Sequence, residues 1–282
     1  MGRETYVVPR GEIMPELPEV ETVRRGLLSL IGKRILSLEL NRPNLRFPFP
    51  DDMDSISGRK ILDVERRAKY LLIALEEGLT WLVHLGMTGR FGHQLEGKHD
   101  HVVVDFEDGT RLVYTDPRRF GVMDLIRPGE SHKLLEHLGP EPLGEGWSGA
   151  ILHESLRNRQ VSIKSALLNQ HIVVGIGNIY ASEILFRSGI SPKRLANNIS
   201  LKMANEIHRQ TQHVLLTAIE AGGSTLKDGQ FKQLDGDLGY FPHEFAVYDR
   251  DGEICVEPNC GKIVKKIVQS GRSTFYCSGC QR

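Results

Sequence analysis

The sequence predicts an α+β protein in which an N-terminal helix and an antiparallel β-sandwich precede a helical region and a four-cysteine β-hairpin. Three observations predict this class. Short runs between residues 59 and 127 alternate apolar and polar side chains, residues from about 145 to 221 follow helical spacing, and all four cysteines lie in the last 28 residues. The breaker cluster at residues 139–144, GPEPLG, marks the boundary between sheet and helices.

The first element is an amphipathic helix that runs from Pro18 to about Ser29. Apolar residues recur there at helical spacing, namely Val20, Val23, Leu27, Leu28 and Ile31. The positive end of this helix would face Pro15 and disfavour a positive charge there. On composition alone, the neighbouring Glu16 and Glu19 are acidic residues that stabilise a helix N-terminus.

Strands and then helices follow in order. The expected strands are Lys60 to Val64, Tyr70 to Leu75, Leu79 to His84, His101 to Phe106, and Arg111 to Tyr114. The expected helices are Ile151 to Leu156, Ile163 to Leu168, Ile179 to Phe186, and Met203 to Ile219. Before the third helix, Gly175 and Gly177 precede Asn178, which can cap it. Such a loop suits a phosphate, although a buried turn is the alternative.

The cysteines form two pairs, Cys255-x4-Cys260 and Cys277-x2-Cys280, separated by sixteen residues. This spacing predicts a four-thiolate structural Zn²⁺ site across a β-hairpin. Disulfides are the weaker interpretation because residues 1–13 lack the apolar core of a secretory signal. The four-residue first spacing leaves the geometry of that knuckle open.

The composition is that of a globular protein, and it does not by itself indicate one class of function. The chain has 282 residues, of which 40% are hydrophobic and 26% are charged, and its formal net charge is zero. A nucleic-acid partner would therefore require basic residues gathered on one face. No apolar run approaches the ~18 residues of a membrane span. We expect a cytoplasmic protein with no membrane partner.

The segment Met14 to Glu21 (MPELPEVE) and six further separated segments occur in the order found in one family. The six are Arg66 to Tyr70, His84 to Met87, Lys98 to His101, Tyr114 to Gly121 (YTDPRRFG), Gly175 to Ala181 (GIGNIYA), and Arg272 to Cys277. In these segments the chain resembles the bacterial formamidopyrimidine-DNA glycosylases, from Pro15 to the C-terminus. The family begins at the residue equivalent to Pro15. The resemblance therefore implies that residues 1–13 are an extension, which we interpret as a mis-assigned start.

The resemblance implies a catalytic set of Pro15, Glu16, Lys69 and Arg272. In the family the terminal proline amine is the nucleophile, whereas a proline nitrogen within a peptide is an amide and cannot attack. Glu16 would donate a proton, Lys69 would assist the first elimination, and Arg272 would assist the second. The segment from Gly222 to Tyr240 matches the loop that closes over the flipped base.

The resemblance also implies DNA contacts. Met87, Arg118 and Phe120 match a wedge that fills the stack after base flipping, with Arg118 facing the orphan cytosine. His99, Arg159 and Asn178 match further DNA-binding positions. Without the resemblance, Met87 and Phe120 would be core residues. His99 and His101 could instead form half of a metal site, but no third ligand is evident.

Together these features predict a bifunctional DNA glycosylase and apurinic/apyrimidinic lyase that binds duplex DNA containing oxidised purines and acts as a monomer. The predicted parts are the extension at 1–13, a catalytic β-sandwich domain at 14–139, a helix-two-turn-helix domain at 145–242 and a zinc finger at 247–282. Two alternatives remain. One is an endonuclease VIII-like enzyme for oxidised pyrimidines, whose members typically begin Pro-Glu-Gly-Pro. The other is a non-catalytic damaged-DNA binder in which the extension masks Pro15.

Overall fold

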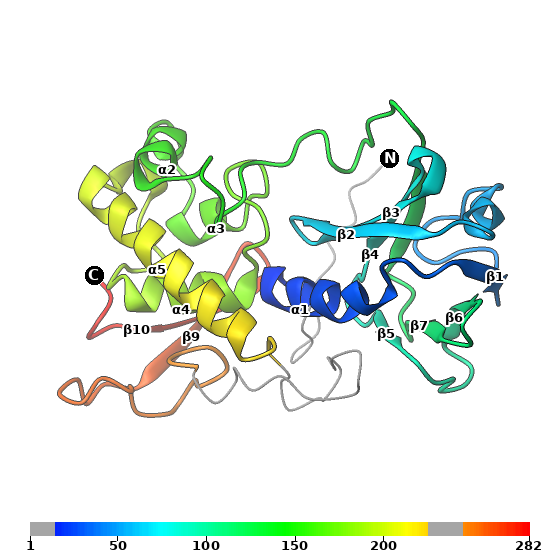
Figure 1. The fold of residues 1–282 in the computed structure, drawn as a ribbon. Helices are drawn as coiled ribbons and strands as arrows, with labels where there is room; N and C mark the ends of the chain where they lie inside the picture. The colour runs from blue at the N-terminus through cyan, green and yellow to red at the C-terminus, as the bar shows by residue number, and fades with distance from the viewer. Residues whose placement is uncertain (1–14, 225–244) are drawn as a thin grey trace, which may run out of the picture. The chain divides into compact units, whose positions relative to one another are not determined.

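A computed structural model describes residues 15–224 and 245–282 (Figure 1). The chain divides into two compact units. Of the described residues, one unit holds 15–137 and 218–224, and the other holds 138–217 and 245–282. The predicted α+β class is confirmed, with a β-sandwich in the first unit and helices with a β-hairpin in the second.

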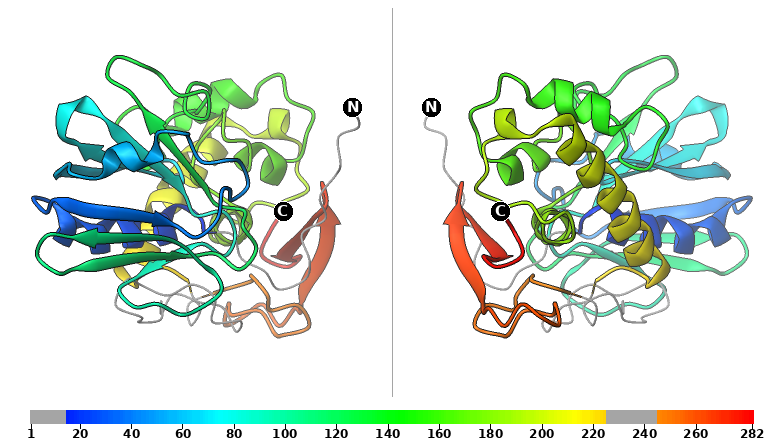
Figure 2. Two further views of the ribbon diagram at one scale, coloured as in Figure 1. Left: turned by 90° about the vertical axis from the view of Figure 1, so that its right-hand side faces the viewer. Right: turned by 90° about the vertical axis from the view of Figure 1, so that its left-hand side faces the viewer.

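The first unit begins with helix α1, Leu17–Leu27, and continues into two four-stranded antiparallel sheets. One sheet has the order β1-β6-β7-β5, with bounds Ile35–Leu40, Asp100–Phe106, Arg111–Thr115 and Arg90–Gly92. The other has the order β2-β3-β4-β8, with bounds Ile61–Arg67, Tyr70–Leu75, Thr80–His84 and Val122–Ile126. Figure 2 shows the two sheets as stacked layers.

Buried apolar side chains that alternate with more exposed residues along the strands form the core of this unit. On β3, Leu71, Ile73 and Leu75 are buried while the residues between them are partly exposed, as one-sided burial of a strand requires. The apolar stripe of α1 joins the same cluster through Val20, Val23 and Leu27. Hydrophobic packing therefore fixes the helix against the sandwich, and the residues at the N-terminal end of the helix are held in place with it.

The second unit contains three shorter helices and most of a long one. Their bounds are Gly149–Leu156 (α2), Ile163–Leu167 (α3), Asn178–Arg187 (α4) and Leu201–Glu220 (α5). Serine side chains start the first two, because Ser148 and Ser162 each accept a hydrogen bond from a backbone N–H of the first turn. Among the described residues, no helix is long and apolar enough to cross a membrane.

The hairpin of β9, Val264–Gln269, and β10, Arg272–Cys277, completes the second unit (Figure 2). Its two-residue turn places Ser270 and Gly271 at φ +48° and +74°, the signs that a type I′ hairpin turn requires. Glu183 of α4 anchors the chain entering this hairpin. Its fully buried carboxylate accepts the backbone N–H groups of residues 246, 247 and 248 at 2.8–3.0 Å.

Candidate functional site

Pro15 and Glu16 lie at the N-terminal end of α1, and both are buried. Glu16 is the N-cap of the helix and forms a reciprocal capping box with Glu19. The Glu16 backbone N–H donates to Glu19 Oε2 at 2.9 Å, and the Glu16 side chain accepts from the Glu19 backbone. The capping role expected from composition is therefore present, and it fixes the orientation of the Glu16 carboxylate beside Pro15.

Glu19 has a second partner in the same unit. Its Oε1 accepts both the backbone N–H and the hydroxyl of Ser224 at 2.8 Å. Ser224 is the last described residue before residues 225–244, where most of the predicted base-covering loop lies outside the described residues. One buried carboxylate thus joins the start of α1 to the residue that leads into that segment.

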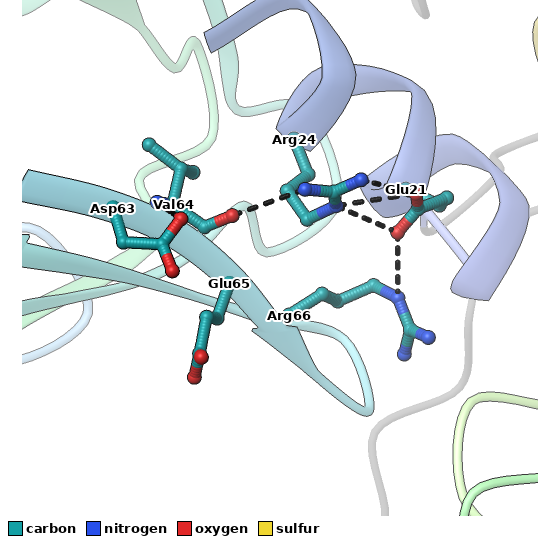
Figure 3. Close-up of a pocket in the computed structure, with 6 residues that line it drawn as sticks. All are labelled: Glu21, Arg24, Asp63, Val64, Glu65 and Arg66. Carbon is teal, nitrogen blue, oxygen red and sulfur yellow. Dashed lines mark hydrogen bonds and ion pairs between the residues drawn. The ribbon is translucent and has the colours of Figure 1, made fainter. Parts of the chain in front are cut away.

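The turn that carries Lys69 is connected to α1 by an ion pair. Arg66 Nε donates to Glu21 Oε2 at 3.2 Å (Figure 3). Arg66 Nη1 donates to the Ala68 carbonyl oxygen at 2.8 Å. Burial alone would raise the pKa of Glu21, but hydrogen bonds and charge from Arg24 and Arg66 outweigh it and lower the pKa. The charged pair therefore holds the turn between β2 and β3 against the helix.

A shallow pocket of about 330 Å³ lies beside this ion pair and is lined by the residues drawn in Figure 3. Glu21 and Arg24, which are both on α1, form an ion pair at 2.9 Å, and Arg24 Nη1 also donates to the Val64 carbonyl oxygen. Three of the five charged side chains that line the pocket, Glu21, Arg24 and Arg66, are thus engaged with one another. We interpret the pocket as a by-product of the helix-to-sheet connection.

Lys69 is buried in the turn before β3, and beside it the structure shows a residue for which the sequence predicted no role. His84 pairs with Tyr70 across β3 and β4, and the two rings are 4.8 Å apart. Burial and the charges of Lys69 and Arg46 lower the pKa of His84 to about 4. A neutral imidazole, whose Nδ1 accepts the Gly86 N–H at 3.0 Å, therefore stands near the Lys69 ammonium.

The predicted wedge residues lie on two loops of the first unit. Met87 is in the loop 85–89 after β4, and Arg118 and Phe120 are in the loop 116–121 after β7. The guanidinium carbon of Arg118 is 4.9 Å from the centre of the Phe120 ring. Met87 is 8% exposed, whereas Arg118 and Phe120 are partly exposed. The structure therefore stacks the cation on the ring and buries the thioether.

Among the described residues, no third metal ligand lies with His99 and His101. His101 is buried and its Nε2 lies 2.8 Å from the Asp116 carbonyl oxygen, while His99 is partly exposed. The four cysteines are the one group of three or more potential ligands that comes together within the described residues. The DNA contact implied for His99 stays a prediction.

In the second unit, the glycine loop before α4 differs from our expectation in one detail. The N-cap of α4 is Gly177, and Asn178 is the first helical residue. Its side chain is used elsewhere, because Asn178 Oδ1 accepts from Lys164 Nζ at 2.7 Å. Gly175 adopts φ +80°, and its N–H donates to Gln170 Oε1 at 2.8 Å, which fixes the loop.

Lys164 connects this loop to the hairpin. The side chain is 1% exposed, and its ammonium also donates to the Ser273 carbonyl oxygen at 2.9 Å and to Thr274 Oγ1 at 2.8 Å. Arg272, which precedes these two residues, begins β10 at the exposed tip of the hairpin. The structure thus brings Asn178 and the Arg272 strand together around one buried cation.

Arg159 is exposed in the turn after α2, where its Nε donates to the Ser155 carbonyl oxygen at 2.8 Å. The exposed lysines of β9, Lys265 and Lys266, add further positive charge to the same unit. The DNA contact that the resemblance implies for Arg159 stays a prediction.

The four cysteine sulfurs converge within 4.8 Å of one another. The Sγ atoms of Cys255 and Cys280 are 3.7 Å apart, and those of Cys260 and Cys277 are 3.4 Å apart. These distances exclude disulfides and fit the ~3.8 Å between ligands of a tetrahedral zinc site with Zn–S near 2.3 Å. The set would hold one structural Zn²⁺, which would fix the hairpin.

The longer first knuckle is accommodated by local hydrogen bonds. The Cys260 N–H donates to the Glu257 carbonyl oxygen at 3.0 Å, and the Cys255 N–H donates to the Lys262 carbonyl oxygen at 2.8 Å. A side chain at Gly279 would place its Cβ 2.8 Å from Cys260 Sγ, so only glycine fits there. The four-residue spacing is therefore compatible with the tetrahedral set.

Three features described above define the class of DNA-repair glycosylases with a helix-two-turn-helix region. They are the Pro-Glu pair at the start of the helix and β-sandwich, the glycine loop before α4, and the four-cysteine hairpin. Three family descriptions match in order: the formamidopyrimidine-DNA glycosylase N-terminal domain over residues 14–123, the formamidopyrimidine-DNA glycosylase H2TH domain over 138–230, and the zinc finger found in FPG and IleRS over 253–282.

Relatives and solved structures agree with these matches. Formamidopyrimidine-DNA glycosylases of Cereibacter sphaeroides and Ruegeria sp. are 49% and 51% identical to the chain, over 95% of it and their own full lengths. The Thermus thermophilus protein has a TM-score of 0.87 and 40% identity, covering 95% of this chain and 98% of its own. A Lactococcus lactis enzyme in complex with DNA containing Fapy-dG has a TM-score of 0.86 and 32% identity, covering 95% and 100%. The chain belongs to the formamidopyrimidine-DNA glycosylase family.

Proposed function

We propose that this chain is a bifunctional DNA glycosylase and apurinic/apyrimidinic lyase of base excision repair that removes oxidised purines from duplex DNA. The substrate class is 8-oxoguanine and formamidopyrimidines. The observation that carries the proposal is the position of Pro15 and Glu16 at the positive end of α1, in a chain that belongs to this family.

The first step needs a neutral amine. A terminal α-amino group has a pKa near ~8, compared with ~10.4 for lysine, and the helix dipole favours the neutral form further. The Pro15 nitrogen attacks C1′ of the damaged nucleotide and the bond from C1′ to the base breaks, with the departing base taking up a proton. The Pro15 nitrogen then loses its proton, the C1′–O4′ bond opens as O4′ is protonated, and the iminium forms. Pro15 must therefore be N-terminal when it reacts. Residues 1–14 lie outside the described residues.

Carboxylate and cationic side chains support the later steps. Glu16, oriented by its capping box, is the proposed proton donor near the sugar ring. Loss of the acidified C2′ proton breaks the C3′–O bond in the first elimination, where Lys69 assists. Arg272 assists the second elimination, which breaks the C5′–O bond. Zn²⁺ supplies structural stabilisation by holding the hairpin on which Arg272 lies.

DNA binding is proposed to use both units. In the first unit, Met87 and Phe120 fill the space left by the flipped nucleotide, and Arg118 donates to the orphan cytosine. His99, Arg159 and Asn178 contact the backbone and set the register. In support, a Lactococcus lactis relative has been solved in complex with DNA containing an abasic site.

The test is cleavage of a panel of duplexes. Protein whose N-terminus is Pro15 should excise 8-oxoguanine and formamidopyrimidine opposite cytosine and leave products of β,δ-elimination. Duplexes with oxidised pyrimidines should be cleaved at least tenfold more slowly. A reversed preference would favour the endonuclease VIII-like alternative. Lesion binding with no base release or strand cleavage would favour the non-catalytic binder.

A further inference from the structure

The Asp116 carboxylate is fully buried and is shared between the two loops that carry the predicted wedge. Within its own loop, Asp116 Oδ2 accepts the Gly121 N–H at 2.8 Å, and Oδ1 accepts the Arg118 N–H at 3.3 Å. Across the gap, Oδ1 accepts the hydroxyl of Thr88. A buried carboxylate requires such donors, because each unmet acceptor would be costly.

The Thr88 hydroxyl has two roles in this arrangement. It donates to Asp116 and accepts the Arg118 N–H at 3.2 Å. Thr88 is 7% exposed and follows Met87 directly in the chain. A single hydroxyl therefore connects the residue next to Met87 with the backbone of Arg118.

Close packing of the backbones fixes the same two loops. Gly86 adopts φ +68°, and a Cβ there would lie 2.3 Å from the backbone carbon of Phe120. The Tyr114 hydroxyl fills the space that a Cβ at Gly89 or Gly121 would need, at 2.1 and 1.9 Å respectively. Neither loop has room to shift alone, so this packing and the polar contacts between the loops together set their relative position.

We propose that Thr88 and Asp116 are positioning residues that hold Met87 at a fixed distance from Arg118 and Phe120, so that all three enter the duplex together. The inference rests on the proposed function. Extruding a nucleotide costs a few kcal/mol, and the wedge and the orphan-base contact offset that cost only if both are in place at the same moment. Neither Thr88 nor Asp116 needs to touch DNA.

The test compares Thr88→Val with Thr88→Ser. Valine keeps the branched shape but removes the hydroxyl, whereas serine keeps the hydroxyl and loses one methyl group. Single-turnover excision of 8-oxoguanine should slow about tenfold in Thr88→Val, because a hydrogen bond to a charged acceptor is lost, and Thr88→Ser should stay within about threefold of wild type. The preference for cytosine over adenine opposite the lesion should fall in parallel.

Cleavage of a preformed abasic site separates positioning from general damage. No base has to be extruded there, so Thr88→Val should cleave it within about twofold of wild type. A Thr88→Val enzyme with wild-type excision and preference would overturn the inference, as would equal losses on both substrates. Failure of the wild-type protein to cleave the abasic site would instead refute the proposed function.

Asp116→Asn gives an independent test if Thr88→Val does not fold. If the asparagine oxygen keeps the hydrogen bond from the Gly121 N–H, the new amide NH₂ group faces the Arg118 N–H and the Thr88 hydroxyl. The contact between the two loops is then weakened by a change on the 116–121 loop instead of at Thr88. The same selective loss of excision, with abasic cleavage retained, is expected. Asp116→Asn with wild-type excision and base preference would contradict the inference.

Discussion

Replacing Lys164 with methionine should destabilise the second unit and weaken DNA binding at once. The Lys164 ammonium is buried and donates to Asn178 Oδ1, the Ser273 carbonyl oxygen and Thr274 Oγ1. Methionine has a similar length but no donor. These oxygens on α4 and β10 would lose a charged partner in a site where solvent has little access.

The size of the effect follows from these three bonds. Hydrogen bonds to a charged group contribute about 1.5–3 kcal/mol each, or roughly 4.5–9 kcal/mol together, and burial of the ammonium offsets several kcal/mol of that. We expect a net loss of about 3 kcal/mol in the free energy of unfolding. At about 2–4 °C per kcal/mol, the transition of this unit should fall by roughly 6–12 °C.

Thermal unfolding and binding to a duplex with an abasic-site analogue measure the two effects. Affinity should drop about tenfold, since Asn178 and the Arg272 strand lose their common anchor. Lys202→Met, which removes an exposed lysine from α5, is the matched control and should shift the transition by less than 2 °C. A Lys164→Met protein that behaves like this control would refute the reasoning.

Three further predictions concern the metal, the orphan base and pH. Metal analysis should give one Zn²⁺ per chain and much less in Cys277→Ser; less than about half an equivalent in intact protein would contradict the four-thiolate site. Arg118→Ala should reduce the preference for cytosine opposite the lesion, whereas Lys265→Ala should lower affinity evenly across sequences; an unchanged preference in Arg118→Ala would reject its assigned contact. Because the pKa of His84 is lowered to about 4, its stabilising contribution should be complete above pH ~6.5 and be lost as pH falls toward 4. The unfolding temperature of His84→Asn should therefore fall less between pH 7 and 4 than that of wild type, and parallel curves would exclude this role.

Local patterns predicted the regular elements where one face is buried. The five expected strands and five expected helices all occur, with bounds that move by a few residues. Three strands of the sandwich were not predicted. In β1 the apolar Leu36 is 61% exposed, so apolar side chains there do not mark the buried face. β5 has only three residues, too few to show a period, and β8 has a single polar residue, Asp124, among five, so it shows little alternation.

The sequence indicated the proposed reacting groups but not the residues that hold them in place. Pro15, Glu16 and the cysteines stand in short motifs that can be recognised by eye. Lys164 and Asp116 act through partners that only folding brings together, at sequence separations of up to 110 and 28 residues. Asn178 was expected to cap α4, but its side chain instead serves Lys164, a partner that local sequence does not reveal.

The central claim is that the Pro15 nitrogen is the nucleophile, and reductive trapping tests it most directly. Protein with Pro15 at its N-terminus should form a covalent adduct with 8-oxoguanine DNA in the presence of borohydride, and mass spectrometry of the digested adduct should place the DNA on Pro15. An intact chain that retains residues 1–13 should not be trapped, because its Pro15 nitrogen is an amide. An adduct on a lysine, or equal trapping of the intact longer chain, would contradict the account.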